Sequence, residues 1–258
     1  MLRPRIIPCL LIKNKGLVKT VQFNSPKYVG DPINAVRIFN EKEVDEIMII
    51  DIDATTTASG PDYKMIKHLA SECRMPLCYG GGINSIDQVK TIIKLGVEKV
   101  SISSLAIENP DMISKIAKEI GNQSIVVVLD VKKRLSDGKY EVFTHNGKKN
   151  TGKCPIEVAR NAEKLGVGEI VINSIDNDGV MKGYDLDLAK KIREAVGVPM
   201  TVLGGAGSLK DIGDLIGHFG IVGAGAGSLF VFKGIYKAVL INYPSPTEKA
   251  DLIRAHYH

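Results

Sequence analysis

The chain contains no tryptophan, few aromatic residues and little excess charge. These shortages limit the classes of partner that it could bind. Aromatic residues make up 5% of its 258 residues, and 34 basic residues face 29 acidic ones. It has no dense basic run with interleaved aromatics, the pattern typical of nucleic-acid interfaces. The mild positive surplus suits small anionic substrates better. We therefore expect no nucleic acid as a partner.

Cysteine and long apolar runs are also scarce. The four cysteines, Cys9, Cys73, Cys78 and Cys154, have no CxxC or metal-ligand spacing, and Cys9 and Cys78 lie in apolar runs as core thiols do. The start of the chain has no signal-peptide pattern, and no apolar run could span a bilayer. These absences predict a cytoplasmic protein that needs no membrane, metal or cofactor.

Short apolar, β-branched runs alternate with segments of helical periodicity. We predict eight strands, at residues 5–11, 47–53, 77–81, 99–103, 125–131, 169–175, 200–204 and 221–226. Helical patterns between them end on glycine, for example at Gly96 and Gly166. Eight βα units in series predict an α/β fold, a single closed (βα)8 TIM barrel over residues 1–258. An open, flavodoxin-like sheet is the alternative.

Two glycine-rich segments reveal an internal repeat. Residues 78–85 read CYGGGINS, and 124 positions later residues 202–209 read VLGGAGSL. The run EIMIIDID at 46–53 likewise returns as EIVINSID at 169–176. The repeat divides the chain into half-barrels of about 1–122 and 123–245, followed by a C-terminal tail of 246–258. Four units in each half favour the closed barrel over the open sheet.

The repeated glycines suggest two anion sites, because glycine lets backbone N–H groups approach an anion closely. One strand after each glycine segment comes Ser103-Ser104 or Gly227-Ser228, at the start of a helix whose dipole favours negative charge. Two symmetry-related sites predict a ligand with a phosphate at each end. The alternative is that the glycines only form tight turns.

The two halves differ at one position that matters chemically. Aligning residues 6–13 with 125–132 places Leu11 beside Asp130. Strand parity points Asp130 into the barrel mouth, where a carboxylate is a candidate general acid or base. A structural aspartate that pairs with Lys132 or a loop lysine is the alternative. Four more aspartates follow strands at this face: Asp51, Asp53, Asp176 and Asp178.

At the opposite end, four strands begin with a charged residue: Arg5, Glu46, Lys99 and Glu169. Arg5 shares parity with Leu11 and should point inward as well. Two cations and two anions would then form a neutral ring under the barrel. Solvated charges, or charges paired with helix ends, are equally consistent with the sequence.

Two connections are longer than ordinary βα loops, and both belong to the C-terminal face, where the active sites of barrels lie. Residues 12–31 alternate lysines with apolar residues, which argues against a disordered insertion. Residues 132–153 contain an Asp137-Gly138 turn followed by strand alternation at 140–144, which predicts a hairpin.

Nearly the whole chain resembles the cyclase subunit of imidazole glycerol phosphate synthase, called HisF. The resemblance is carried by RIIPCL at 5–10, GGGI at 80–83, FT at 143–144, GKKNTG at 147–152, SID at 174–176 and GGAG at 204–207. It implies a duplicated (βα)8 barrel of the lyase class with a HisH-type glutaminase docked below. It also implies that ammonia enters through the charged ring and that a doubly phosphorylated substrate binds above.

The resemblance also assigns roles to residues. Arg5, Glu46, Lys99 and Glu169 match the ammonia gate of the family. Substrate and phosphate contacts carry over onto Lys19, Gly82, Ser103, Ser104, Asp176, Gly205, Gly227 and Ser228, with Ser103 and Gly227 as substitutions. The family's cyclases use two aspartates, of which Asp130 remains as the catalytic candidate and Leu11 replaces the other. Losing a general acid or base typically costs ~10²–10⁴-fold in rate.

The runs CLLIK at 9–13 and KYVGDPIN at 27–34 resemble a paralogous branch associated with surface-polysaccharide or flagellar-glycan gene clusters. There the barrel and its glutaminase would supply ammonia to a third enzyme that amidates a nucleotide-activated sugar. Three functions stay open. They are this ammonia-conducting role, a histidine-pathway cyclase in which another residue such as Asp51 replaces the lost carboxylate, and a phosphate-binding scaffold that only activates the glutaminase.

Overall fold

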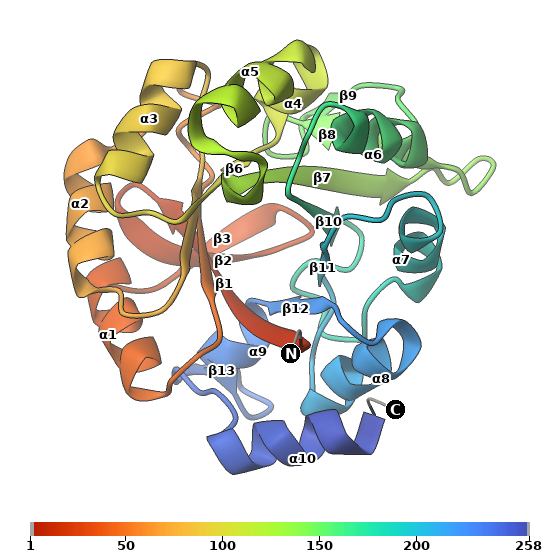
Figure 1. The fold of residues 1–258 in the computed structure, drawn as a ribbon. Coiled ribbons are helices and arrows are strands. Elements are labelled where there is room, and N and C mark those ends of the chain that lie inside the picture. Colours follow the sequence, from red (N-terminus) through yellow and green to blue (C-terminus); the bar gives the residue numbers. More distant parts are fainter. Residues whose placement is uncertain (1–2, 257–258) are drawn as a thin grey trace.

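A computed structural model describes residues 3–256, and its centre is a closed parallel barrel (Figure 1). The eight barrel strands are β1 (Arg5–Lys13), β4 (Ile47–Asp51), β5 (Leu77–Gly80), β6 (Lys99–Ile102), β7 (Ile125–Lys133), β10 (Glu169–Ser174), β11 (Met200–Leu203) and β12 (Gly223–Ala226). Pairing of β12 with β1 and of β7 with β10 closes the sheet on itself. The predicted strands are all present, and the predicted barrel is confirmed.

Helices surround the barrel on its outside (Figure 1). They are α1 (Pro32–Glu41), α2 (Tyr63–Glu72), α3 (Ile86–Lys94), α4 (Ser104–Glu108), α5 (Asp111–Ile120), α6 (Pro155–Lys164), α7 (Leu186–Arg193), α8 (Leu209–Phe219), α9 (Ser228–Val231) and α10 (Pro246–His256), with a short 3₁₀ turn η1 (Asn122–Ser124). Gly96 and Gly166, predicted to end helices, have φ of 100° and 93°. The predicted C-terminal tail forms α10, and residues 257 and 258 of it lie outside the described residues.

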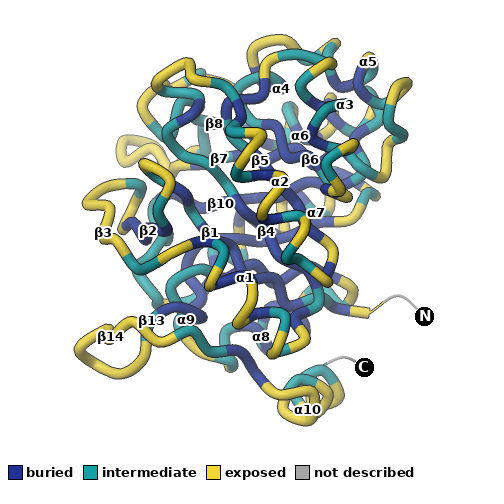
Figure 2. Tube along the Cα trace, turned by 90° about the vertical axis from the view of Figure 1, so that its left-hand side faces the viewer, coloured by how far each residue is buried: buried dark blue, intermediate teal, exposed yellow. Residues whose placement is uncertain are grey.

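Two separate apolar layers hold this architecture together, because alternate residues of a strand face opposite sides of the sheet. The larger layer lies between strands and helices, and the smaller one fills the barrel interior. The inner layer consists of Ile7, Cys9, Met48, Cys78, Val126, Val128, Val171 and Leu203, with Leu11 and Ile50 packed against it. The tube coloured by burial shows the barrel strands as the buried centre of the molecule (Figure 2).

Each half-barrel carries an antiparallel hairpin directly after its first strand. Strands β2 (Gly16–Val21) and β3 (Asn24–Gly30) extend β1, and strands β8 (Tyr140–Thr144) and β9 (Lys149–Asn150) extend β7. The hairpin predicted around 140–144 is confirmed, whereas the two strands within residues 12–31 were not foreseen. The repeat therefore includes both long connections.

A small third hairpin, β13 (Phe232–Lys233) with β14 (Ala238–Val239), stands apart from the barrel sheet. Within residues 3–256, no helix is long and apolar enough to cross a membrane.

Candidate functional site

A cavity of about 410 Å³ opens at the C-terminal ends of the barrel strands. Its floor is the top of the inner apolar layer, and its walls are the two glycine segments and the loops after β4, β6 and β12. The turns of the two large hairpins meet above it, because a Cβ on Gly147 would lie only 2.9 Å from the ring of Phe23. A partly enclosed site of this size suits a small-molecule ligand.

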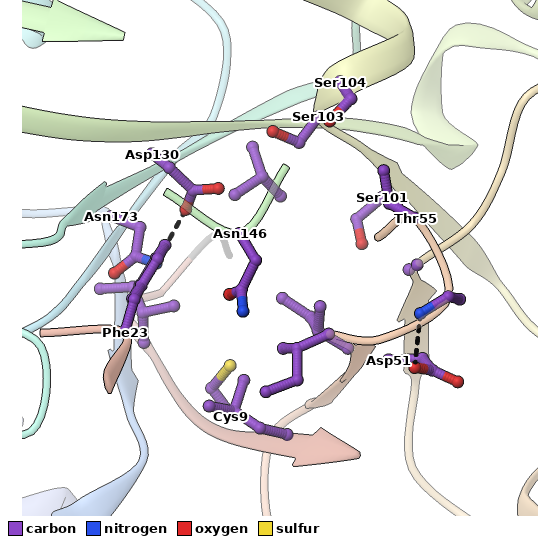
Figure 3. A pocket seen from close by; sticks show the side chains of 18 of the residues that line it. Cys9, Phe23, Asp51, Thr55, Ser101, Ser103, Ser104, Asp130, Asn146 and Asn173 are labelled. Atoms are coloured by element: carbon purple, nitrogen blue, oxygen red, sulfur yellow. Dashed lines mark hydrogen bonds between the residues drawn. The ribbon is translucent and has the colours of Figure 1, made fainter. Parts of the chain in front are cut away.

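Asp130 and Asn173 form the polar side of the cavity floor (Figure 3). Register between β7 and β10 sets the two residues opposite each other, and Asn173 Nδ2 donates to Asp130 Oδ1 at 3.0 Å. Burial raises the pKa of Asp130 to about 7, although the hydrogen bond from Asn173 acts in the other direction. A carboxyl group with such a pKa can donate or accept a proton near neutrality. The catalytic role of Asp130 stays a prediction.

The symmetry-related place in the first half is apolar. Register between β1 and β4 sets Leu11 opposite Ile50, and both side chains line the cavity. Asp51, at the end of β4, lies across the cavity from Asp130 (Figure 3). Its Oδ1 accepts from the backbone N–H groups of Asp53 and Ala54 at 3.0 and 3.1 Å, and burial raises its pKa nonetheless.

Asp176, expected among the substrate contacts, does not line the cavity. The backbone N–H of Lys133 donates to its carboxylate at 2.8 Å, and Gln22 Nε2 donates to its carbonyl oxygen at 2.8 Å. Asp176 therefore joins both hairpins to the end of β10. Asp178 lines the cavity instead, where it accepts from Thr20 Oγ1 at 2.8 Å and burial raises its pKa.

The three residues of the first predicted anion site, Gly82, Ser103 and Ser104, all line the cavity, and anion binding by them stays a prediction. The hydroxyl of Ser103 is buried and has no hydrogen-bond partner among residues 3–256, so it is available to a ligand. The N–H of Gly82 donates to Thr55 Oγ1 at 3.2 Å, and the N–H of His145 donates to Ser104 Oγ at 3.2 Å. Thr55 and His145 were not foreseen as neighbours of this site.

The second predicted anion site gathers Lys19, Gly205, Gly227 and Ser228 on the cavity wall. Lys19 reaches it from β2, donates to the carbonyl oxygen of Cys9, and is only 5% exposed. Burial lowers the pKa of Lys19, while Cys9 and Asp178 act against this effect. A Cβ on Gly227 would lie 2.6 Å from Lys19 Nζ, so glycine at this position makes room for the amine.

Asn146 is a further cavity residue that the sequence analysis missed. It belongs to the β8–β9 turn, has a φ of 56°, and points into the cavity (Figure 3). Asparagine tolerates this left-handed conformation better than most residues. The Asn146-Gly147 dipeptide was the available signal, since this pair is typical of tight hairpin turns.

Four charges meet at the N-terminal end of the barrel, opposite the cavity. Arg5 binds both Glu46 and Glu169, and Lys99 Nζ lies 2.9 Å from a carboxylate oxygen of each glutamate. The glutamates are buried, and Thr201 Oγ1 donates to Glu169 at 2.6 Å. Burial acts to raise the pKa of Glu169, but Arg5 and Lys99 outweigh it and hold that pKa below its usual value. The arrangement is a closed, neutral ring.

Comparison with known proteins identifies the family. The model of the family described as "Histidine biosynthesis protein" matches residues 5–237. The chain belongs to this family.

Among its relatives, the HisF-like proteins match it over nearly their whole length. The chain is 58% identical to a Leptospira interrogans protein provisionally named imidazole glycerol phosphate synthase subunit HisF, over 98% of this chain and 99% of that protein. It is 51% identical to the provisionally named hisF2 subunit of Pseudomonas aeruginosa, over 95% and 97%. It is 40% identical to a Clostridium botulinum protein named imidazole glycerol phosphate synthase subunit HisF, over 94% and 96%. The chain is thus a HisF-type subunit.

Proposed function

We propose that this HisF-type chain receives ammonia from a HisH-type glutaminase bound under the barrel. In this proposal the ammonia serves a third enzyme, a sugar amidotransferase that amidates a nucleotide-activated sugar for a surface polysaccharide or flagellar glycan. One observation carries the proposal: the charged ring below is complete, whereas at the cavity floor the position related by the repeat to Asp130 is held by Leu11. Ammonia delivery needs the ring, and cyclisation in the resembled enzymes needs carboxylates on both sides.

The region between the ring and the cavity is filled by the inner apolar layer, which includes Ile7, Cys9 and Val171. Such a layer excludes a solvated ion, so in this proposal ammonia crosses it as a neutral molecule when these side chains move apart. Of the two ring cations, Lys99 is the better candidate for a moving gate. Both cations contact both glutamates, but Lys99 carries a point charge on a flexible stem, whereas the planar guanidinium group of Arg5 fixes its orientation.

The two anion sites support a phosphorylated small molecule as a ligand of the cavity. The unpartnered hydroxyl of Ser103 lies at one site and the buried amine of Lys19 at the other. Such a ligand is either a substrate or a signal that reports occupancy of the mouth to the glutaminase below.

A second candidate, the imidazole-forming cyclase of histidine biosynthesis, is favoured by one observation. Asp51 lies across the cavity from Asp130, and burial raises the pKa of both carboxyl groups. Asp51 would then supply the proton transfer that Leu11 cannot.

The deciding experiment combines the purified chain with a HisH-type glutaminase. Glutamate release and cyclisation of the histidine-pathway intermediate are measured in the same reaction. We expect glutamine hydrolysis with little imidazole product. Cyclisation at the rate of an ordinary HisF enzyme would refute the ammonia-delivery role. If the sugar amidotransferase incorporates no glutamine-derived nitrogen although it accepts free ammonium, only the role of glutaminase activator is left.

A further inference from the structure

The β13–β14 hairpin carries the largest cluster of exposed apolar side chains in the described part of the chain. Ile235 and Tyr236, in its turn, are 88% and 89% exposed, and Val239 and Leu240 are about half exposed. The base of the hairpin is tied down, since Leu240 N donates to Val231 O at 2.9 Å. A monomer gains nothing from holding these side chains in water, so exposed apolar clusters of this kind mark interaction sites.

The hairpin is continuous with the outer strand β3. Lys27 Nζ lies 5.3 Å from the ring centroid of Phe232, and the neighbouring Tyr28 is 66% exposed. In the described part of the chain, strand β3 pairs only with β2, so its outer edge leaves backbone groups unpaired there. Figure 2 shows β3 and β14 on the same side of the molecule. We call this surface the rim patch; its residues are Lys27, Tyr28, Lys233, Ile235, Tyr236, Lys237, Val239 and Leu240.

The charge of the rim patch narrows the choice of partner. Residues 24–30 and 232–247 contain three lysines and no aspartate or glutamate. Two copies of the patch would therefore repel each other, which argues against self-association through this surface. An apolar centre flanked by lysines is complementary to an apolar pocket with an acidic rim.

We infer that the rim patch is the docking surface for the protein that accepts the ammonia, an amidotransferase with an apolar pocket edged by acidic residues. This inference rests on the proposed function. The patch joins the β2–β3 hairpin that covers the cavity, and the cavity lies at the end of the barrel opposite the charged ring. A partner seated there would receive ammonia at its exit and leave the lower face free for the glutaminase.

The test uses the purified glutaminase complex and a sugar amidotransferase of the proposed kind from the same organism. The double variant Ile235→Ser/Tyr236→Ser should bind the amidotransferase at least about tenfold more weakly, because exposed aromatic and aliphatic anchors dominate such interfaces. Reversing charge with Lys233→Glu/Lys237→Glu should weaken binding further at low salt. Leu135→Ser is the matched control, since Leu135 is fully exposed on the β7–β8 turn and should be neutral.

Glutaminase turnover reports folding in every variant and should stay unchanged. If the patch variants bind normally and nitrogen still reaches the sugar, the inference is wrong and the proposed function stands. If the wild-type complex neither binds the amidotransferase nor transfers nitrogen, both fail together. A separate experiment measures binding of the complex to phosphatidylglycerol vesicles. If the Ile235 and Tyr236 substitutions weaken vesicle binding but leave amidotransferase binding unchanged, the rim patch is a membrane-binding surface and the inference is wrong.

Discussion

The two half-barrels share strands, hairpins and glycine turns, yet they contribute unequally to the charged ring and to the cavity floor. At the lower ring, the first half supplies Arg5, Glu46 and Lys99, and the second supplies Glu169 alone. At the cavity floor, the first half has the apolar Leu11–Ile50 pair, and the second has the hydrogen-bonded Asp130–Asn173 pair. Strand pairing uses backbone groups only, so the two copies could diverge in chemistry while keeping one geometry.

The two large hairpins also share a backbone arrangement but carry different side chains. Both continue the first strand of their half and fold back over the cavity. The first brings Lys19 and Thr20 to the wall, and the second brings His145 and Asn146. The same backbone arrangement thus brings a buried lysine to the cavity from the first hairpin, and a histidine and an asparagine from the second.

The substitution Leu11→Asp removes the main difference between the two halves at the cavity floor. The register of β1 and β4 already holds this side chain at the mouth, so the substitution should raise imidazole formation at least about 10²-fold. Product is measured with the histidine-pathway intermediate and free ammonium, which bypasses the glutaminase. Leu11→Asn is the control, because it has similar polarity but cannot carry a proton. An equal gain from both variants would show that ionisation at this position is irrelevant.

The substitution Lys99→Ala removes one of the two cations of the ring and leaves Arg5 as the partner of both buried glutamates. We expect the free energy of unfolding to fall by about 2–3 kcal/mol, somewhat less than for a fully buried pair because Lys99 is partly exposed. Urea denaturation measures the loss. Lys90→Ala, which breaks the exposed pair with Glu119, is the control and should have a much smaller effect.

The same Lys99 variant tests conduction. Glutamine should still be hydrolysed, but the ratio of aminated product to glutamate should fall as ammonia escapes into solution. Added ammonium should restore product. Unchanged transfer from glutamine would show that the ring is only structural.

The polar half of the floor is probed by Asp130→Asn and pH. The pKa of Asp130 is about 4 when unfolded and about 7 when folded, so the folded state binds its proton more tightly. The contribution of Asp130 to the free energy of unfolding is therefore most favourable below about pH 4 and is lost as the pH rises through 7. Three pKa units at about 1.4 kcal/mol each correspond to about 4 kcal/mol. The unfolding free energy of the variant should therefore exceed that of the wild type by up to this amount at pH 8, and the difference should vanish near pH 4. A difference independent of pH would rule out the raised pKa.

The smallest expected effects concern the two anion sites, where the halves are most alike. Crystals grown in phosphate should hold one phosphate near Gly82 and Ser104 and another near Gly205 and Ser228. Ser104→Ala and Ser228→Ala should each weaken phosphate binding about fivefold, the value of one hydrogen bond of about 1 kcal/mol. Calorimetry on each variant should show loss at its own site only. Equal losses at both sites would contradict two independent sites.

The barrel, its duplication and the inward direction of Arg5, Leu11 and Asp130 could all be predicted from the amino-acid sequence. These features follow from local periodicity, since alternation along a strand decides which side chains face inward. Which side chains contact one another could not be predicted, because these contacts arise only in the folded chain. In the folded chain Asn173 lies beside Asp130, Asp178 lines the cavity and Asp176 points away from it. Residues 12–31 fold over the cavity mouth, so that Lys19 is buried. Those contacts depend on register between distant strands and on the course of turns, which local pattern does not encode.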